Sequence, residues 1–468
     1  MTSPPITPEQ LSALPPELRI VVQAIVDHYE QRIASLESEL SAARKTPRNS
    51  SLPPSSEHPH AKPPSSQSNT KPKSKRKRGG QPGHKKHERA LIPTEQCQQV
   101  VPVKPNRCRR CGRGLCGHDP APLRHQVWEL PPIEPHVSEY QLHRLSCTCG
   151  ATTCAALPAG VPRGQAGPRL IALATLLMGC FRQSKRRVAL FLEQVLNQPC
   201  SPGWVVKLQN HGTAALRPCY DELAAQLPTE AQLSIDETPN KQGPEKAWLW
   251  TMVATTFTLF AFRTTRAATV LTELLGTAYG GVVNCDRAKM YFSLSRLQWC
   301  WAHLKRDFQA LIDSGDGVKK RLGHDLLRPT RKMFQLWARY RDGTLTRRGF
   351  QCQMKPIRKE IEDLLLRGKF AGIGMADELW RHRDRLWTFV DVKGVEPTNN
   401  ASERALRHAV IWRKLSFGTQ SEAGSRFVET MLTVVETCRQ RSINVFAFVT
   451  TAVEAHLHHQ PTQSLARV

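Results

Sequence analysis

The first pattern along the chain is a heptad-like spacing of apolar residues near its start. Residues 18 to 44 contain no Gly or Pro, and their apolar residues recur at alternating spacings of 4 and 3: Val22, Val26, Tyr29, Ile33, Leu36 and Leu40. This spacing is that of an a/d seam. We predict that residues 1–45 hold a helix, which either pairs with a second copy in a short coiled coil or docks on its own domain.

The pattern is lost over residues 46–95, where Pro, Ser and Lys replace large apolar residues. Such a segment buries too little apolar surface to offset the entropy of ordering, so it is predicted as a linker. Its second half is a basic arm, whose composition favours contact with nucleic-acid phosphates over a merely solvated run of charge. The arm residues predicted to bind DNA are Lys73, Lys75, Arg76, Lys77, Arg78, Lys85 and Lys86.

Helical spacing of apolar residues returns over residues 164–228, for example at Leu170, Ala174 and Leu177. A break at 197–200 is followed by Ser201, a good N-cap residue, and by Pro202, which suits the first helical position. We predict a helix-turn-helix-like DNA-binding domain here. Because tight helix pairs occur in any helical domain, a purely structural pair is the alternative.

From residue 229 the pattern changes to strands. Runs rich in β-branched and aromatic residues predict strands at 233–236, 247–254, 257–263 and 281–286, with a helix at 267–279 before the last of them. Asp236 and Asp286 stand at the ends of the first and fourth strands. If these two strands lie side by side in a mixed sheet, both carboxylates reach one edge, which is the ribonuclease-H-like arrangement.

The next segment is too long for a simple connection. The 117 positions between Asp286 and Glu403 exceed what one strand and a loop require, and residues 301–387 have helical spacing. We predict a helical insertion at about residues 296–394 within a catalytic domain at 229–448, followed by a C-terminal tail at 449–468. The predicted fold class is multidomain α+β, with a ribonuclease-H-like mixed-sheet core, the helical insertion, the N-terminal coiled coil, a zinc-binding ribbon and the helix-turn-helix-like domain.

Composition narrows the class of partner. The chain has 468 residues, of which 40% are hydrophobic, enough for at least one sizeable core. Its 66 Lys and Arg against 40 Asp and Glu give a net charge of +26, which indicates a polyanionic partner such as nucleic acid. No apolar run is long enough to cross a bilayer, and the start of the chain lacks a signal pattern. We expect a cytoplasmic, nucleoid-associated protein with no membrane partner.

Seven of the 14 cysteines lie between Cys97 and Cys154. In a cytoplasmic protein, such clustering favours metal ligation over disulfides. Cys108 and Cys111, followed by Gly112, have the CxxCG form of a zinc knuckle.

The second half of the zinc site is less regular. Cys147 and Cys149 are its predicted ligands, although only one residue separates them, and Cys116, His118 and Cys154 are alternatives. A strand-like stretch at Gln126 to Leu145 would join the two pairs into a small ribbon held by a structural zinc ion, which places a zinc-binding domain at 96–163. Free thiols in a small β domain are the competing interpretation.

Paired carboxylates at one sheet edge suit divalent-metal chemistry. Asp236 and Asp286 offer hard oxygen ligands for Mg²⁺. Two ions about 4 Å apart can activate a nucleophile and stabilise the leaving oxygen during displacement at phosphorus. The candidate for a third carboxylate is Glu403, at the start of a predicted helix that also carries Arg404 and Arg407, both expected to contact DNA. Its rivals are Glu237, Asp307 and Glu396.

Cys300 and His303 are also candidates for half of a metal site. Since the sequence offers no second pair at suitable spacing, packing of Cys300 and Trp301 is favoured, with His303, Lys305 and Arg306 facing DNA.

These motifs together resemble the insertion sequence sixty-six (TnpC-type) family of transposases over most of the chain. They are GGQPGH at 79–84, the Cys108/Cys111 segment, SIDETP at 234–239, CDRAKMY at 285–291, CWAHLKRDF at 300–308 and NNASERALR at 399–407. The resemblance implies that Asp236, Asp286 and Glu403 form a DDE triad. It implies that this triad binds two Mg²⁺, which Mn²⁺ can replace, to cleave element ends and join the 3′-hydroxyl to target DNA.

The expected partners are therefore element-end and target DNA, a second copy of the chain in a homo-oligomer, and small accessory proteins of the same element. Two other functions fit the same residues. One is a zinc and helix-turn-helix DNA-binding protein without catalysis, and the other is a metal-dependent nuclease that only hydrolyses DNA.

Overall fold

The computed structural model describes residues 15–43, 45, 49 and 89–466. The chain divides into two compact units, one of Met1–Pro59 with His136–Val468 and the other of His60–Pro135. The basic arm, including Lys73 to Lys86, lies outside the described residues, so its contact with DNA stays a prediction.

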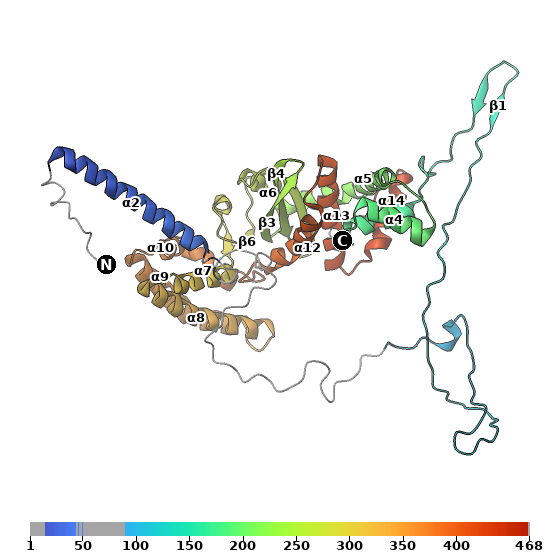
Figure 1. The fold of residues 1–468 in the computed structure, drawn as a ribbon, viewed down its shortest axis with the longest axis horizontal. Helices are drawn as coiled ribbons and strands as arrows, with labels where there is room; N and C mark the ends of the chain where they lie inside the picture. The colour runs from blue at the N-terminus through green and yellow to red at the C-terminus, as the bar shows by residue number, and fades with distance from the viewer. Residues whose placement is uncertain (1–14, 44, 46–48, 50–88, 467–468) are drawn as a thin grey trace. The chain divides into compact units, whose positions relative to one another are not determined.

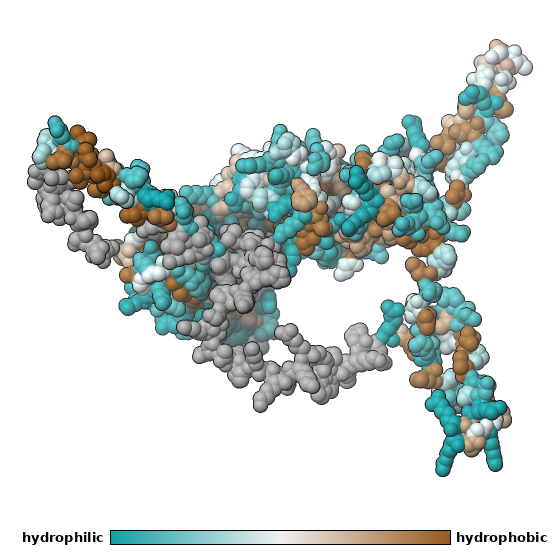
Figure 2. Space-filling view, viewed as in Figure 1, coloured by the Kyte–Doolittle hydropathy of each residue, from teal (hydrophilic) through white to brown (hydrophobic). Residues whose placement is uncertain are grey.

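The predicted N-terminal helix is confirmed as α2, Pro16–Ala43. Many of its large side chains are exposed, among them Ile25, Tyr29, Ile33 and Leu36, and Figure 2 shows brown, hydrophobic patches along the helix. Exposed apolar side chains suit pairing with another helix, but whether α2 forms a coiled coil stays a prediction.

A five-stranded mixed sheet forms the centre of the larger unit. Its strands are β3 Gln232–Gln242, β4 Glu245–Val253, β5 Thr258–Arg263, β6 Val282–Cys285 and β7 Leu297–Trp299, in the order β5-β4-β3-β6-β7. β3, β4 and β5 pair antiparallel, whereas β6 runs parallel to β3 and β7 parallel to β6. The prediction that the first and fourth strands are neighbours is confirmed by β3 and β6. The sequence pattern missed β7, which has three residues.

Both faces of the sheet are covered, since most residues of β4 and β5 are buried. On one face, Ala247, Leu249 and Phe260 pack against α12, Asn400–Ser416, and α13, Glu422–Gln440. On the opposite face, Trp250 and Met252 belong to the main core. The connection from β5 to β6 contains α6, Thr269–Leu275, which is shorter than the predicted helix at 267–279.

Helix α13 also protects the edge strand β5 through hydrogen bonds. The backbone N–H groups of Thr258, Phe260 and Phe262 donate to Thr437 Oγ1 (3.2 Å), Thr433 Oγ1 (2.9 Å) and Glu429 Oε2 (2.8 Å). Four residues of helix rise about 6 Å and two residues of strand about 6.8 Å, so one acceptor per turn meets every second N–H. The unpaired side of β5 is thereby closed to another strand.

The helical segment at 164–228 is confirmed as α3 Pro168–Gly179, α4 Lys185–Leu196 and α5 Pro202–Gln226. Ser201 is the N-cap of α5, as predicted, and its side chain accepts from the Trp204 N–H at 3.2 Å. The predicted tail at 449–468 begins inside a helix: α14, Val445–Leu457, packs against α3 and α5 and buries Phe448 and Val449. Its burial depends on helices that lie far earlier in the chain, so no local pattern marked it.

Helices fill the predicted insertion between β7 and α12. They are α7 Trp301–Asp313, α8 Gly317–Arg341, α9 Arg347–Phe370, α10 Gly374–Arg381 and α11 Thr388–Asp391. Helices α7 to α10 pack on one another and lie together beside the sheet (Figure 1). None of the helices in the described part of the chain combines the length and apolar composition needed to cross a membrane.

The cysteine-rich segment differs from the prediction. The structure has one short antiparallel pair here, β1 Arg144–Ser146 and β2 Thr152–Cys154. Residues 126–143, which were predicted as strand-like, form no strand. Pro131, Pro132 and Pro135 lack the N–H that a sheet ladder needs, and the exposed side chains there find no apolar face to cover. The two predicted cysteine pairs fall in different compact units.

Removing one acceptor from the α13 ladder tests its contribution to stability. We expect Thr433→Val to lower the free energy of unfolding by about 1–3 kcal/mol, because the buried Phe260 N–H loses its acceptor. Thr430→Val is the matched control, since the Thr430 hydroxyl on the same helix is buried without a partner among the described residues. Urea unfolding measures both variants, and equal losses would contradict the role of the ladder.

Candidate active site

The two aspartates lie at equivalent positions on neighbouring parallel strands. Asp286 directly follows β6, but the prediction that the first strand ends at Asp236 is wrong, because β3 continues to Gln242 along its antiparallel pairing with β4. Ser234 of β3 is paired with Asn284 of β6, and Asp236 and Asp286 each stand two residues further along. Because successive side chains of a strand alternate between faces, each aspartate shares a face with the residue two positions before it. This register brings both carboxylates to the same face of the sheet, where β6 ends beside the middle of β3.

The start of α12 is attached to that same face. The Ser234 and Ser402 hydroxyls lie 3.0 Å apart, and the Asn284 side chain donates to the carbonyls of Glu396 (2.7 Å) and Thr398 (2.9 Å). Glu403 follows Ser402 in the first turn of the helix. The hydrogen bonds that dock α12 on the sheet therefore carry Glu403 toward the two aspartates.

The capping of α12 differs from the sequence expectation. Asn399 holds the N-cap position, but its side chain makes no capping hydrogen bond, and both of its amide atoms are buried without a partner among the described residues. Ser402 Oγ instead donates to the Asn399 carbonyl at 2.8 Å. The helix start is thus fixed by its attachment to the sheet rather than by an N-cap side chain.

Electrostatics link the three acids. Burial raises the pKa of Asp236 well above its ordinary value, and the charges of Glu237, Asp286 and Glu403 raise this pKa further. The Glu237 N–H, which donates to Asp236 Oδ1 at 2.9 Å, opposes the shift. Like charges within range of one another are unfavourable unless a cation joins them, so this group of carboxylates is suited to bind a cation.

The rival acids are engaged elsewhere or exposed. Arg266 forms an ion pair with Glu237 Oε1. Tyr291, which lies in the 3-10 helix η4, Lys289–Ser293, donates to Glu237 Oε2. Arg287 pairs with Asp307 at 2.8 Å and equally with Glu378. The Glu396 side chain is exposed. The sequence pattern did not reveal these arginine and tyrosine partners, since they act on residues 20 to 91 positions away.

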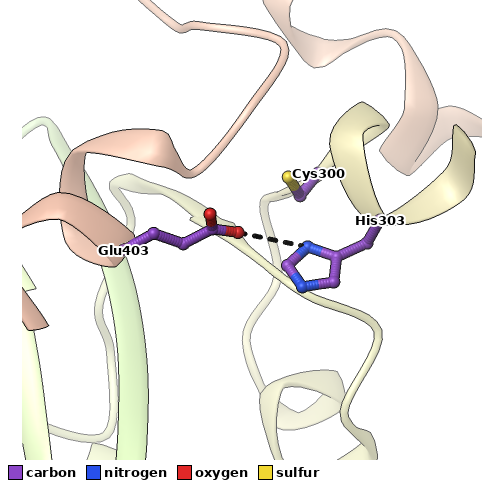
Figure 3. Close-up of side chains that lie close together, drawn as sticks. All are labelled: Cys300, His303 and Glu403. Carbon is purple, nitrogen blue, oxygen red and sulfur yellow. Dashed lines mark ion pairs between the residues drawn. The ribbon is translucent and has the colours of Figure 1, made fainter. Parts of the chain in front are cut away.

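Helix α7 of the insertion places His303 and Arg306 against Glu403. His303 Nδ1 lies 3.7 Å and Arg306 Nη2 lies 3.5 Å from Glu403 Oε1, and Figure 3 shows the imidazole facing the carboxylate. Burial and the Arg306 charge lower the pKa of His303, whereas the Glu403 charge opposes this shift, so the neutral ring is favoured. The expectation that His303 simply faces DNA therefore leaves out its main neighbour.

The other predicted residues of this region divide by exposure. Cys300 and Trp301 are buried, as predicted. Lys305 is exposed, and its ammonium lies 5.4 Å from the ring centre of Phe334. Arg404 and Arg407 are exposed on α12. Contact of these cationic side chains with DNA stays a prediction.

The two cysteine pairs form similar turns. In the first, Gly112 has φ +73° and donates to the Cys108 carbonyl at 2.9 Å, and in the second, Gly150 has φ +86° and donates to the Cys147 carbonyl at 2.9 Å. Backbone N–H groups within each turn lower the pKa of Cys108 and of Cys147. Donors aimed at sulfur favour the thiolate, which is the form that binds zinc. The shorter spacing of the second pair thus keeps the features of a knuckle.

Comparison with known proteins decides the family. The sequence profile described as the Transposase IS66 family matches residues 163–426, more than half of the chain. The chain belongs to this family of transposases. The matched IS66 region contains the sheet, the insertion and the three candidate carboxylates. Residues 5–90 match a family of unknown function, DUF6444.

A curated relative is the uncharacterized protein y4qI of Sinorhizobium fredii (strain NBRC 101917 / NGR234), which is 25% identical to the chain. The similarity covers 44% of the chain and 43% of the relative, so the chain matches less than half the length of that protein.

Neutralising one candidate carboxylate should relieve the repulsion between them. Without divalent metal at pH 7, we expect Asp236→Asn to raise the free energy of unfolding by about 1 kcal/mol, because the folded state disfavours this charge. Glu396→Gln, at an exposed acid, is the control and should leave stability unchanged. A destabilised Asp236→Asn variant would contradict the repulsion.

Proposed function

We propose that the protein is a DNA transposase in which Asp236, Asp286 and Glu403 are the catalytic carboxylates. The proposal is that they bind two Mg²⁺, or Mn²⁺, cleave the ends of a mobile element and join the 3′-hydroxyl to target DNA. Membership of the IS66 family supports the reaction class. The observation that carries the residue assignment is the register of β3 and β6, with Glu403 on the helix docked beside them.

The strand arrangement supports a ribonuclease-H-like core. Three antiparallel strands are followed by two parallel ones on the far side of the first, which is the order that the predicted fold requires. The middle of β3, the position after β6 and the first turn of α12 supply one acid each, so the three acids come from separate elements. Sites built on such elements hold catalytic groups more closely than sites built on loops.

The donor set fits a hard divalent cation. All three groups are carboxylates, and Glu403 Oε1 is buried without a hydrogen-bond partner among the described residues. When bound, the metal would supply activation of the attacking oxygen and neutralisation of charge on the leaving oxygen. The chain's own part is to hold the carboxylates in place: Ser402 anchors the start of α12, and the backbone N–H groups of Glu237 and Ala288 orient Asp236 and Asp286.

Cationic side chains next to the acids are proposed to bind the DNA backbone. Arg404 and Arg407 are exposed on the helix that carries Glu403, and Lys305 is exposed on α7. Phosphate contacts of this kind position a duplex without reading its sequence. The basic arm and the helices α4 and α5 are proposed to contact the element ends as well. Pairing of two chains through α2 and binding of accessory proteins are further parts of the proposal.

We also propose that the cysteine pairs hold one structural zinc ion through Cys108, Cys111, Cys147 and Cys149. The matched turns, with a positive-φ glycine after each pair and N–H donors toward the sulfur atoms, support this assignment.

Strand transfer with labelled element ends and Mg²⁺ tests the catalytic assignment. We expect Asp236→Asn, Asp286→Asn and Glu403→Gln each to reduce joined product by at least about a hundredfold, because each removes a metal ligand. Glu396→Gln, which alters an exposed acid close to α12, should join DNA like the wild type. Wild-type joining by Asp286→Asn would overturn the assignment, and nicks without joined product would identify a nuclease.

Metal analysis tests the zinc assignment. We expect Cys108→Ser and Cys147→Ser each to reduce the zinc content by about one ion per chain, because three remaining ligands bind a structural zinc less tightly. Cys352→Ser, at an exposed cysteine far along the chain, is the control. Unchanged zinc in either knuckle variant would remove that residue from the ligand set.

A further inference from the structure

Three side chains with metal-binding atoms meet at the junction of the insertion and α12. One ligand atom from each of Cys300, His303 and Glu403 lies within 4.8 Å of the other two, and no other group of three or more such residues occurs in the described part of the chain. Cys300 is the N-cap residue of α7, and His303 lies in its first turn. Figure 3 shows the thiol, the imidazole and the carboxylate directed toward a common space.

The space between these groups contains unsatisfied polar atoms. His303 Nδ1 and Glu403 Oε1 are both buried without a hydrogen-bond partner among the described residues, and they are 3.7 Å apart, too far to bond each other. A neutral imidazole has one lone pair that can bind a metal, and the carboxylate has several. Buried groups that lack a partner are costly, so a ligand that joins them would be stabilised.

The donor types select the kind of ion. Thiolate, imidazole and carboxylate together suit Zn²⁺ and similar ions, whereas Mg²⁺ prefers oxygen ligands only. Ligands of a tetrahedral zinc with bonds of 2.0–2.3 Å lie about 3.4–3.6 Å apart, close to the present separation of His303 and Glu403. Burial raises the pKa of the Cys300 thiol to about 11, and the Asn399 N–H, which donates to Cys300 Sγ at 3.4 Å, partly opposes this shift, so a bound cation is needed to hold the thiolate.

We propose that Cys300, His303 and Glu403 form a second metal site, specific for Zn²⁺ or a similar transition-metal ion and separate from the cysteine knuckles. The Cys300 thiol gives its proton to water on binding, and a water molecule completes the four ligands. The site is distinct from the carboxylate pair of Asp236 and Asp286, but the two share Glu403.

Sharing of Glu403 has a consequence that rests on the proposed function. An ion held by Cys300 and His303 draws Glu403 away from the two aspartates, so Zn²⁺ inhibits Mg²⁺-supported strand transfer. Arg306 opposes this state, because its guanidinium lies 3.5 Å from Glu403 Oε1 and repels a second cation there. Arg306 therefore competes with the bound ion for Glu403.

Cobalt binding by the full chain tests the site without DNA. In a Cys108→Ser, Cys147→Ser background, which lacks the knuckles, we expect Co²⁺ to produce thiolate charge-transfer absorption that disappears on adding Cys300→Ser. His303→Gln should weaken Co²⁺ affinity by at least about tenfold, as expected for loss of a ligand. Arg306→Gln should strengthen it by up to about fivefold, because it removes the competing cation. A purely structural disturbance would not strengthen binding.

Cys438→Ser is the matched control, since Cys438 is also a buried thiol but belongs to no such group. If the knuckle variants fail to fold, the same comparison in the wild-type chain should give one Zn²⁺ fewer per molecule for Cys300→Ser. Absorption or zinc content that is unaffected by Cys300→Ser would overturn the site.

Strand transfer at fixed Mg²⁺ with added Zn²⁺ tests the consequence. Relative to its own zinc-free rate, each protein should be inhibited in proportion to its zinc affinity, with Cys300→Ser the least sensitive. Equal inhibition of the wild type and Cys300→Ser would overturn the shared role of Glu403. Absence of strand transfer from every protein would contradict the proposed function alone, because the cobalt measurement does not depend on it.

Discussion

Repulsion between acids gathered on one face of the sheet is the constraint around which the larger unit is built. Asp236 is half-buried beside Glu237, and the charges of Asp286 and Glu403 act on it as well. The surrounding residues hold the acids in place but neutralise only some of their charges. Arg266 and Tyr291 contact Glu237, whereas among the described residues no arginine or lysine forms an ion pair with Asp236 or Asp286. Asp236 and Asp286 are thus left without a cationic side-chain partner in the part of the chain that the structure describes.

The helical insertion preserves this geometry because it leaves and re-enters the core at one place. The Trp301 N–H donates to the Pro397 carbonyl at 2.9 Å, which ties the start of α7 to the segment before α12. The Gln298 side chain accepts from the Phe389 N–H at 2.8 Å, and Thr388 Oγ1 donates to the Leu297 carbonyl at 2.7 Å, which ties the end of the insertion to β7. A long insertion whose two ends are attached close together disturbs the sheet little. It also brings His303 and Arg306 to Glu403.

Local pattern predicted the elements better than it predicted their contacts. The strands β3 to β6 and the helices α3 to α5 follow from periodicity and from Ser201 and Pro202, since these signals depend on neighbouring residues. The position of Asp236 beside Asp286 followed from strand order alone. Three residues were too few to reveal β7, and prolines between 126 and 145 overrode an apparent strand pattern. The helix α14 was missed because its burial depends on α3 and α5, which lie more than 200 positions earlier.

The group of Cys300, His303 and Glu403 could not be predicted from the sequence. Their i, i+3 spacing indicates two ligands on one helical turn, but the third, Glu403, lies 100 positions further along and on another helix. Only the joined ends of the insertion bring it near. Glu403 therefore stands between a set of hard oxygen donors and a pair of softer nitrogen and sulfur donors. Since Mg²⁺ prefers oxygen ligands and Zn²⁺ accepts nitrogen and sulfur as well, the two sets of donors differ in the ion that suits them.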